Sequence, residues 1–185
     1  MSVGINIFPT AKRPIIYEIF RQKLVSDSQF VGASASVKID GLLELPDRRK
    51  LNSVEEMRIS GIYILDTVPL NGMMISFADN NLQPFSEHLM LDDVGANLDE
   101  QVRFDLGNKW YQAGFSISVS STAARIPQEP MMFIALSACL AELCEGYVSI
   151  YEKGFFSLDI GTYSPAEFRT VQPRFSGIGP FEMNV

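Results

Sequence analysis

The chain has 185 residues, of which 22 are acidic and 15 basic, so its net charge at pH 7 is −7. This acidic balance argues against nucleic-acid binding through phosphate neutralisation, which needs clustered lysines and arginines. With 46% hydrophobic and 20% charged residues, the composition is that of a chain that packs a core. We expect one α+β domain over residues 1–185, with an irregular tail from about residue 172.

The N-terminal third predicts a helix followed by a strand. Pro14 is a favoured first-turn residue, and apolar residues at helical spacing follow it, which predicts an amphipathic helix that ends near Ser26-Asp27. From Phe30 to Leu45 apolar and polar residues alternate, and a period of two predicts a half-buried strand.

A hairpin is predicted next. Ser53 and Glu56 have the spacing of a capping box, which predicts a short helical turn before it. The apolar segments Ile59–Val68 and Met73–Ala78 are joined by a loop that contains Asn71-Gly72. Asn-Gly between hydrophobic runs is a strong hairpin signal, because both residues tolerate positive φ.

Two further strands are predicted before a long helix. Val102, Phe104 and Leu106 alternate with polar residues, and Gly107-Asn108 then predicts a turn. In the segment 115–120, phenylalanine, isoleucine and valine alternate with serine, which predicts a strand with one apolar and one hydroxyl face.

The C-terminal third predicts a buried helix and a second hairpin. The segment Met131–Glu145 is apolar almost all round, as in a helix packed centrally against a sheet. Tyr147–Tyr151 and Phe155–Ile160 predict the hairpin, and Ser164 before a proline predicts a helix start. The fold class is therefore α+β, with a mostly antiparallel sheet packed by an apolar central helix and an N-terminal amphipathic helix.

The chain shows no secretory signal and no apolar run long enough to span a bilayer, so we expect a cytoplasmic protein with no membrane association. The two cysteines, Cys139 and Cys144, point away from each other on the predicted helix. Two reduced thiols are therefore expected rather than a disulfide.

No catalytic or cofactor motif stands out. His88 is the only histidine, which is too few for the usual transition-metal ligand sets, and the acidic residues lack calcium-loop spacing. The serines of the segment 116–121 lack a nucleophile elbow. The prediction is a protein that is not an enzyme, with no catalytic residues, no metal site and no cofactor.

Most of the net negative charge lies in one acidic stretch, Asp79–Asp105, which holds seven acids against one arginine. Clustered like charges repel one another, so such a stretch is either a solvated face or a recognition surface for a basic partner. As the charged rim of that surface we predict Glu87, Asp92, Asp93, Asp99 and Glu100. Trp110 and Tyr111 follow as candidate aromatic anchors, the alternative for Trp110 being core packing.

Three segments carry a resemblance to a known class of proteins. They are Ala-Cys-Leu-Ala-Glu-Leu-Cys-Glu-Gly at 138–146, the strand, acidic turn and aromatic pair at 147–156, and Tyr-Ser-Pro-Ala-Glu-Phe at 163–168. Together they resemble the C-terminal part of bacterial immunity proteins of polymorphic-toxin systems. The resemblance implies a small cytosolic protein that binds and blocks a toxin made by the same cell, and it carries over no catalytic residues.

The leading hypothesis is a protein-binding module, an immunity protein that neutralises a cognate toxin through its acidic surface. One alternative is a small-ligand-binding protein or enzyme whose pocket is built from distant residues, such as His88 with two carboxylates. Another is a subunit of a secretion or phage assembly. The oligomeric state is left open.

Overall fold

The computed structural model describes residues 4–33, 38–68, 72–79, 95, 97–121, 128–151 and 157–171. These residues form an antiparallel sheet with helices, which confirms the predicted α+β fold. The helices are α1 (Tyr17–Phe30), α2 (Glu100–Ala113), α3 (Gln128–Leu143) and α4 (Pro165–Arg169).

The main sheet has eight strands in the order β10-β9-β1-β8-β7-β6-β3-β4, and all of its neighbouring strands are antiparallel. Two short strands, β2 and β5, pair separately. The strand bounds are β1 (Gly4–Phe8), β2 (Ile15–Ile16), β3 (Lys38–Glu44), β4 (Arg49–Lys50), β5 (Glu56–Met57), β6 (Ile62–Val68), β7 (Met73–Asp79), β8 (Phe115–Ser121), β9 (Tyr147–Ile150) and β10 (Gly161–Tyr163).

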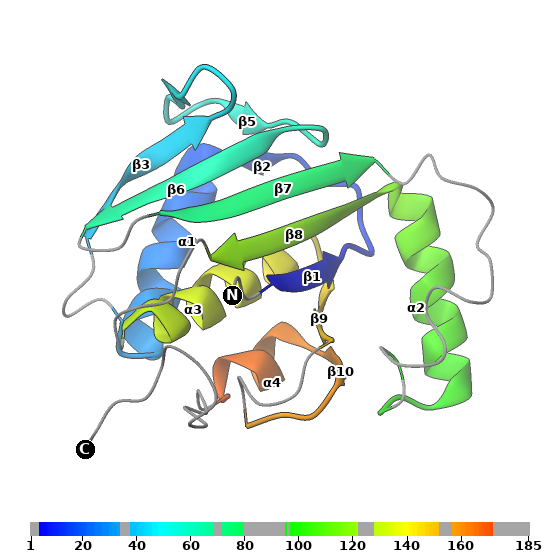
Figure 1. The fold of residues 1–185 in the computed structure, drawn as a ribbon. Helices are drawn as coiled ribbons and strands as arrows, with labels where there is room; N and C mark the ends of the chain where they lie inside the picture. The colour runs from blue at the N-terminus through cyan, green and yellow to red at the C-terminus, as the bar shows by residue number, and fades with distance from the viewer. Residues whose placement is uncertain are drawn as a thin grey trace.

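Helix α3 is the central helix that its sequence predicts. It packs against α1, against α4 and against strands β1, β8 and β9, and every residue from Met132 to Ala141 is buried. In Figure 1, α1 and α3 lie together along one face of the sheet, α4 is drawn below β1, and α2 stands at the side, past the end of β7. The core is therefore built between the sheet and α3, and α2 is peripheral to it.

Strand β8 has the two faces expected from its alternation. Ile117 and Val119 are fully buried, whereas Ser118 is exposed on the opposite face. Ser118 donates to Asn6 of β1 at 2.5 Å, which links the polar row across two strands. The β6–β7 pairing confirms the first predicted hairpin, and Gly72 before β7 has the positive φ (85°) that favours glycine.

The beginning and end of the first helix differ from the prediction. Ile15 and Ile16 pair with β5, and the helix starts at Tyr17, whose N–H donates to the carbonyl of Glu55 at 2.9 Å. A neighbouring backbone segment thus satisfies the first turn in place of a capping side chain. The helix continues past the predicted end to Phe30, and Gly32 then ends it with a φ of 78°.

Two other predictions of local structure are wrong. The strand predicted from Phe30 starts only at Lys38, because the first residues of that alternation complete α1 and its end. The capping box predicted for Ser53 and Glu56 does not form: a single turn, in which the Glu55 N–H donates to the Asn52 carbonyl at 3.1 Å, takes its place, and Glu56 belongs to β5.

The predicted strand at Val102–Leu106 and the turn after it are also wrong, because these residues lie within helix α2. Asp99 caps the helix by accepting the N–H of Gln101 at 2.9 Å, and Gly114 ends it with a φ of 81°. The helix signals at the two ends, the cap Asp99 and the terminal Gly114, are therefore stronger evidence for the local structure than three alternating residues between them.

The C-terminal elements follow the prediction with one shift. Strands β9 and β10 pair, but β10 begins at Gly161 rather than within Phe155–Ile160. Ser164 and Glu167 form a complete capping box that starts α4. Residues 152–156, which hold the expected hairpin loop and the start of its second strand, and the tail from residue 172 lie outside the described residues.

Strand β1 is an interior strand that the sequence did not predict. It lies between β8 and β9 in the interior of the sheet, with Ile5 and Ile7 buried against the helices. Only five residues alternate there, so the local signal is short.

Candidate functional site

The described part of the acidic stretch is centred on α2. Asp99 precedes the helix and Glu100 begins it, and both are exposed. Leu106 and Ala113 lie on the buried side of α2, and Gly107, which has no side chain, is buried between Phe104 and Tyr111. This arrangement places the acids on a helix that projects beside the sheet (Figure 1).

Asp99 has a structural role in addition to its charge. Its side chain accepts the backbone N–H of Gln101, and its carbonyl accepts the N–H of Arg103 at 2.9 Å. A carboxylate at this position also interacts favourably with the positive end of the helix dipole. Its presence is therefore explained by capping alone, whereas Glu100 accepts no bond of this kind.

The two predicted aromatic anchors are in different environments. Trp110 is half-buried and packs edge-on against Phe8 of β1, with ring centroids 5.1 Å apart. This contact fits the core-packing alternative for Trp110. Tyr111 is 48% exposed and stays a candidate.

Phe104 is the site residue that the sequence reasoning missed, because it was assigned to a strand. It is 56% exposed. Seven residues separate it from Tyr111 and four from Glu100, which places the three side chains along one stripe of the helix surface. The stripe extends for about 16 Å from Glu100 to Tyr111 at 1.5 Å per residue. The capping pattern Asp99…Gly114 is the signal that could have revealed it.

A hollow of about 360 Å³ lies on another side of α2. Its lining combines apolar side chains with charges of both signs, and Asp105 also accepts a bond from Gln101 at 3.0 Å. The lining residues are Thr10, Val102, Asp105, Leu106, Lys109, Glu145 and Tyr147. The mixed charges give the hollow no clear preference for one ligand class.

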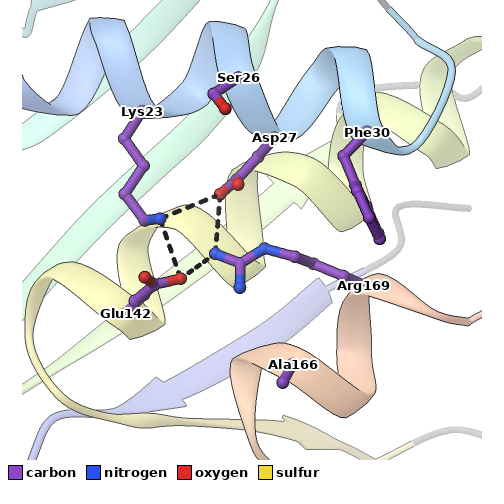
Figure 2. A pocket seen from close by; sticks show the side chains of 7 residues that line it. All are labelled: Lys23, Ser26, Asp27, Phe30, Glu142, Ala166 and Arg169. Carbon is purple, nitrogen blue, oxygen red and sulfur yellow. Dashed lines mark hydrogen bonds and ion pairs between the residues drawn. The ribbon is translucent and has the colours of Figure 1, made fainter.

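A second hollow, of about 370 Å³, lies where α1, α3 and α4 meet (Figure 2). Arg169 of α4 donates to Asp27 of α1 at 3.0 Å and to Glu142 of α3, and Lys23 Nζ lies 2.9 Å from Glu142 Oε2. Figure 2 shows the four charged groups pointing toward one another, with Phe30 to one side. We name these four residues the ionic cluster.

The ionic cluster is electrically balanced, with two acids and two bases. Partial burial would raise the pKa of Glu142, but the hydrogen bonds from Lys23 and Arg169 outweigh it and lower that pKa below its usual value. Each charge has a partner within the cluster. The cluster therefore joins three helices and offers no free charge to a ligand.

Several predicted residues cannot be placed. Glu87, Asp92 and Asp93, together with His88, lie outside the described residues. Of the predicted rim, only Asp99 and Glu100 are described, and the structure brings them together at the start of α2.

Both cysteines are unpaired and fully buried, as predicted. Burial raises the pKa of Cys144 to about 12 and that of Cys139 well above its usual value. A thiol with so high a pKa is a poor nucleophile at neutral pH.

Among the described residues, no three His, Cys, Asp or Glu side chains are grouped so that they could hold a metal ion. The helices of the described part are too short or too polar to cross a membrane. No protein-family model, curated protein or solved structure matches the chain.

Proposed function

We propose that the chain is a non-enzymatic protein-binding module that recognises a basic protein through the exposed stripe of α2. The observation that carries the proposal is the stripe itself, where Phe104 and Tyr111 lie exposed in line with Glu100. Interfaces commonly combine apolar and aromatic residues at the centre with charge around them.

The negative charge of the acidic stretch favours a basic partner over a neutral one. The stretch from Asp79 to Asp105 holds seven of the 22 acids and only one of the 15 bases. A concentrated negative potential accelerates encounter with a positively charged macromolecule and orients it before contact. The partner class that fits best is a cationic protein.

The C-terminal resemblance makes the proposal more specific. On that basis the partner is a cognate toxin of the same cell, and the chain is an immunity protein that acts in the cytoplasm by occluding its toxin. Many nuclease toxins are basic, so the charge argument is consistent with this assignment without depending on it.

The test begins with capture from a lysate of the native cell, followed by purification of the captured protein and direct measurement of its affinity. Glu100→Lys and Phe104→Ser should each weaken binding at least tenfold, and Glu100→Lys should also reduce the salt dependence. Val54→Ser is the matched apolar control, because Val54 is exposed in the turn before β5, a strand that is drawn well away from α2 in Figure 1. Unchanged affinity in both α2 variants would contradict the proposal.

A further inference from the structure

The side chain of Asn97 forms two hydrogen bonds to one residue of strand β10. Asn97 Nδ2 donates to the Thr162 carbonyl at 2.9 Å, and the Thr162 N–H donates to Asn97 Oδ1 at 2.9 Å. Thr162 is the middle residue of β10, which lies at one end of the main sheet. Its N–H and C=O point to the same side, so the asparagine amide occupies the place of a neighbouring strand.

Gly161 makes this contact possible. A Cβ atom at Gly161 would lie 2.6 Å from Asn97 Oδ1 and 2.7 Å from its Cγ, closer than real Cβ contacts allow. The asparagine amide therefore packs directly against the glycine backbone. We name the arrangement of Asn97, Gly161 and Thr162 the Asn97 latch.

The latch lies next to the start of the proposed docking helix. Asn97 precedes the cap residue Asp99 by two positions, and the intervening Leu98 donates its N–H to Gly95 at 2.9 Å. At the other end of α2, Trp110 packs on Phe8 of β1. The helix is thus held near both of its ends, by the Trp110–Phe8 contact at one end and by the latch next to the end that carries Glu100.

We propose that Asn97 and Gly161 are positioning residues for partner binding. The latch fixes the first turn of α2 against the sheet edge, so that Glu100 and Phe104 are already in place when the partner arrives. A preformed surface binds more tightly because less conformational freedom is lost on association. This inference rests on the proposed function of the α2 stripe.

Hydrogen exchange tests the latch without any partner. Asn97→Ala removes the acceptor of the Thr162 N–H, so that amide and those of the first turn of α2 should exchange about tenfold faster. Gly161→Ala should do the same, because the new methyl group displaces the asparagine amide. The double variant should add little to either single variant, since all three lose the same contact. Unchanged exchange at Thr162 in Asn97→Ala would overturn the proposal.

The matched control is Asn52→Ala, an exposed asparagine in the loop before β5, which should leave these amides unchanged. The protein has a single tryptophan, so its fluorescence reports the other end of α2. Trp110 emission should stay the same in Asn97→Ala, which shows that the variant is folded and that only the start of the helix is released. A shift to the emission of the unfolded chain would mean that Asn97 supports the whole fold, and would overturn the local role.

The affinity for the purified partner from the capture experiment then distinguishes the positioning role of Asn97 from an effect of charge. Asn97→Asp adds a negative charge to the acidic stretch, so an effect of charge alone would tighten binding of a basic partner. The carboxylate has no N–H for the Thr162 carbonyl, so loss of position should instead weaken binding about tenfold, mainly through faster dissociation. Tighter or unchanged binding would overturn the positioning role. Failure of the proposed function is a different result, in which Glu100→Lys and Phe104→Ser have no effect.

Discussion

Arg169 and Asp27 lie 142 positions apart in the chain, yet their side chains are joined by a hydrogen bond of 3.0 Å. Asp27 is a buried residue of α1, and Arg169 is the last residue of α4. The same guanidinium also bonds Glu142 of α3, so one side chain connects three helices. Arg169 therefore adds a polar attachment of α4 to the apolar one made by the buried side chain of Phe168.

Replacing this arginine with methionine should destabilise the protein. Arg169→Met keeps the aliphatic stem but leaves Asp27 with Lys23 alone, at 3.8 Å. Because the carboxylate stays buried without its closest partner, we expect a loss of about 2 kcal/mol in the free energy of unfolding. Urea denaturation measures it.

The control for that variant is Arg13→Met. Arg13 pairs with Glu145, but both side chains are at least half exposed. Solvent-exposed pairs contribute little, so the loss should stay below about 1 kcal/mol. Equal losses in the two variants would show that the ionic cluster has no special role.

The ionic cluster should also make stability depend on pH in the acid range. Hydrogen bonds from Lys23 and Arg169 outweigh burial and hold the pKa of Glu142 below its unfolded value, so the ionised form stabilises the folded state. That contribution is complete above the ordinary carboxyl pKa of about 4.3 and is lost as the pH falls through the lowered pKa. In Arg169→Met the pKa is lowered less, so unfolding midpoints measured from pH 6 to pH 2 should fall less steeply. An identical slope in both proteins would contradict this.

The sequence predicted those elements whose signals are local. The apolar helix α3, the two-faced strand β8 and the capping box at Ser164 each follow from residues within the element. By contrast, α1 starts at Tyr17 because a carbonyl from residue 55 accepts its N–H. No local pattern reveals a cap that comes from elsewhere in the chain.

The sequence predicted the negative charge of the candidate site but not the helix that carries it. The acidic stretch includes Glu100, and Tyr111 was predicted as a candidate aromatic anchor. Phe104 was assigned to a core strand, because three alternating residues fit a period of two as well as part of a helix. The Asn97 latch joins two segments 65 residues apart, a pairing that composition and spacing do not contain.

Two variants of Asp99 distinguish the contribution of its capping bond to stability from that of its charge. Asp99→Ala removes the acceptor of the Gln101 N–H and should lower the free energy of unfolding by about 1 kcal/mol. Asp99→Ser keeps an acceptor at the cap and should cost only a few tenths of a kcal/mol, although it removes the same charge. Denaturant titration of the two variants measures the difference. Equal losses would show that the charge of Asp99, and not its cap bond, matters for stability.

The buried thiols should be unreactive until the protein unfolds. Cys139 and Cys144 have no exposed surface, and burial raises the pKa of Cys144 to about 12, so the reactive thiolate is scarce at pH 8. A chromogenic disulfide reagent should therefore label no thiol in the native protein and both in denaturant. Because labelling then requires opening of the core around α3, its rate in Arg169→Met should rise if the ionic cluster holds α4 over that helix. Rapid labelling of the unmodified protein at pH 8 would show that α3 is accessible in the native state.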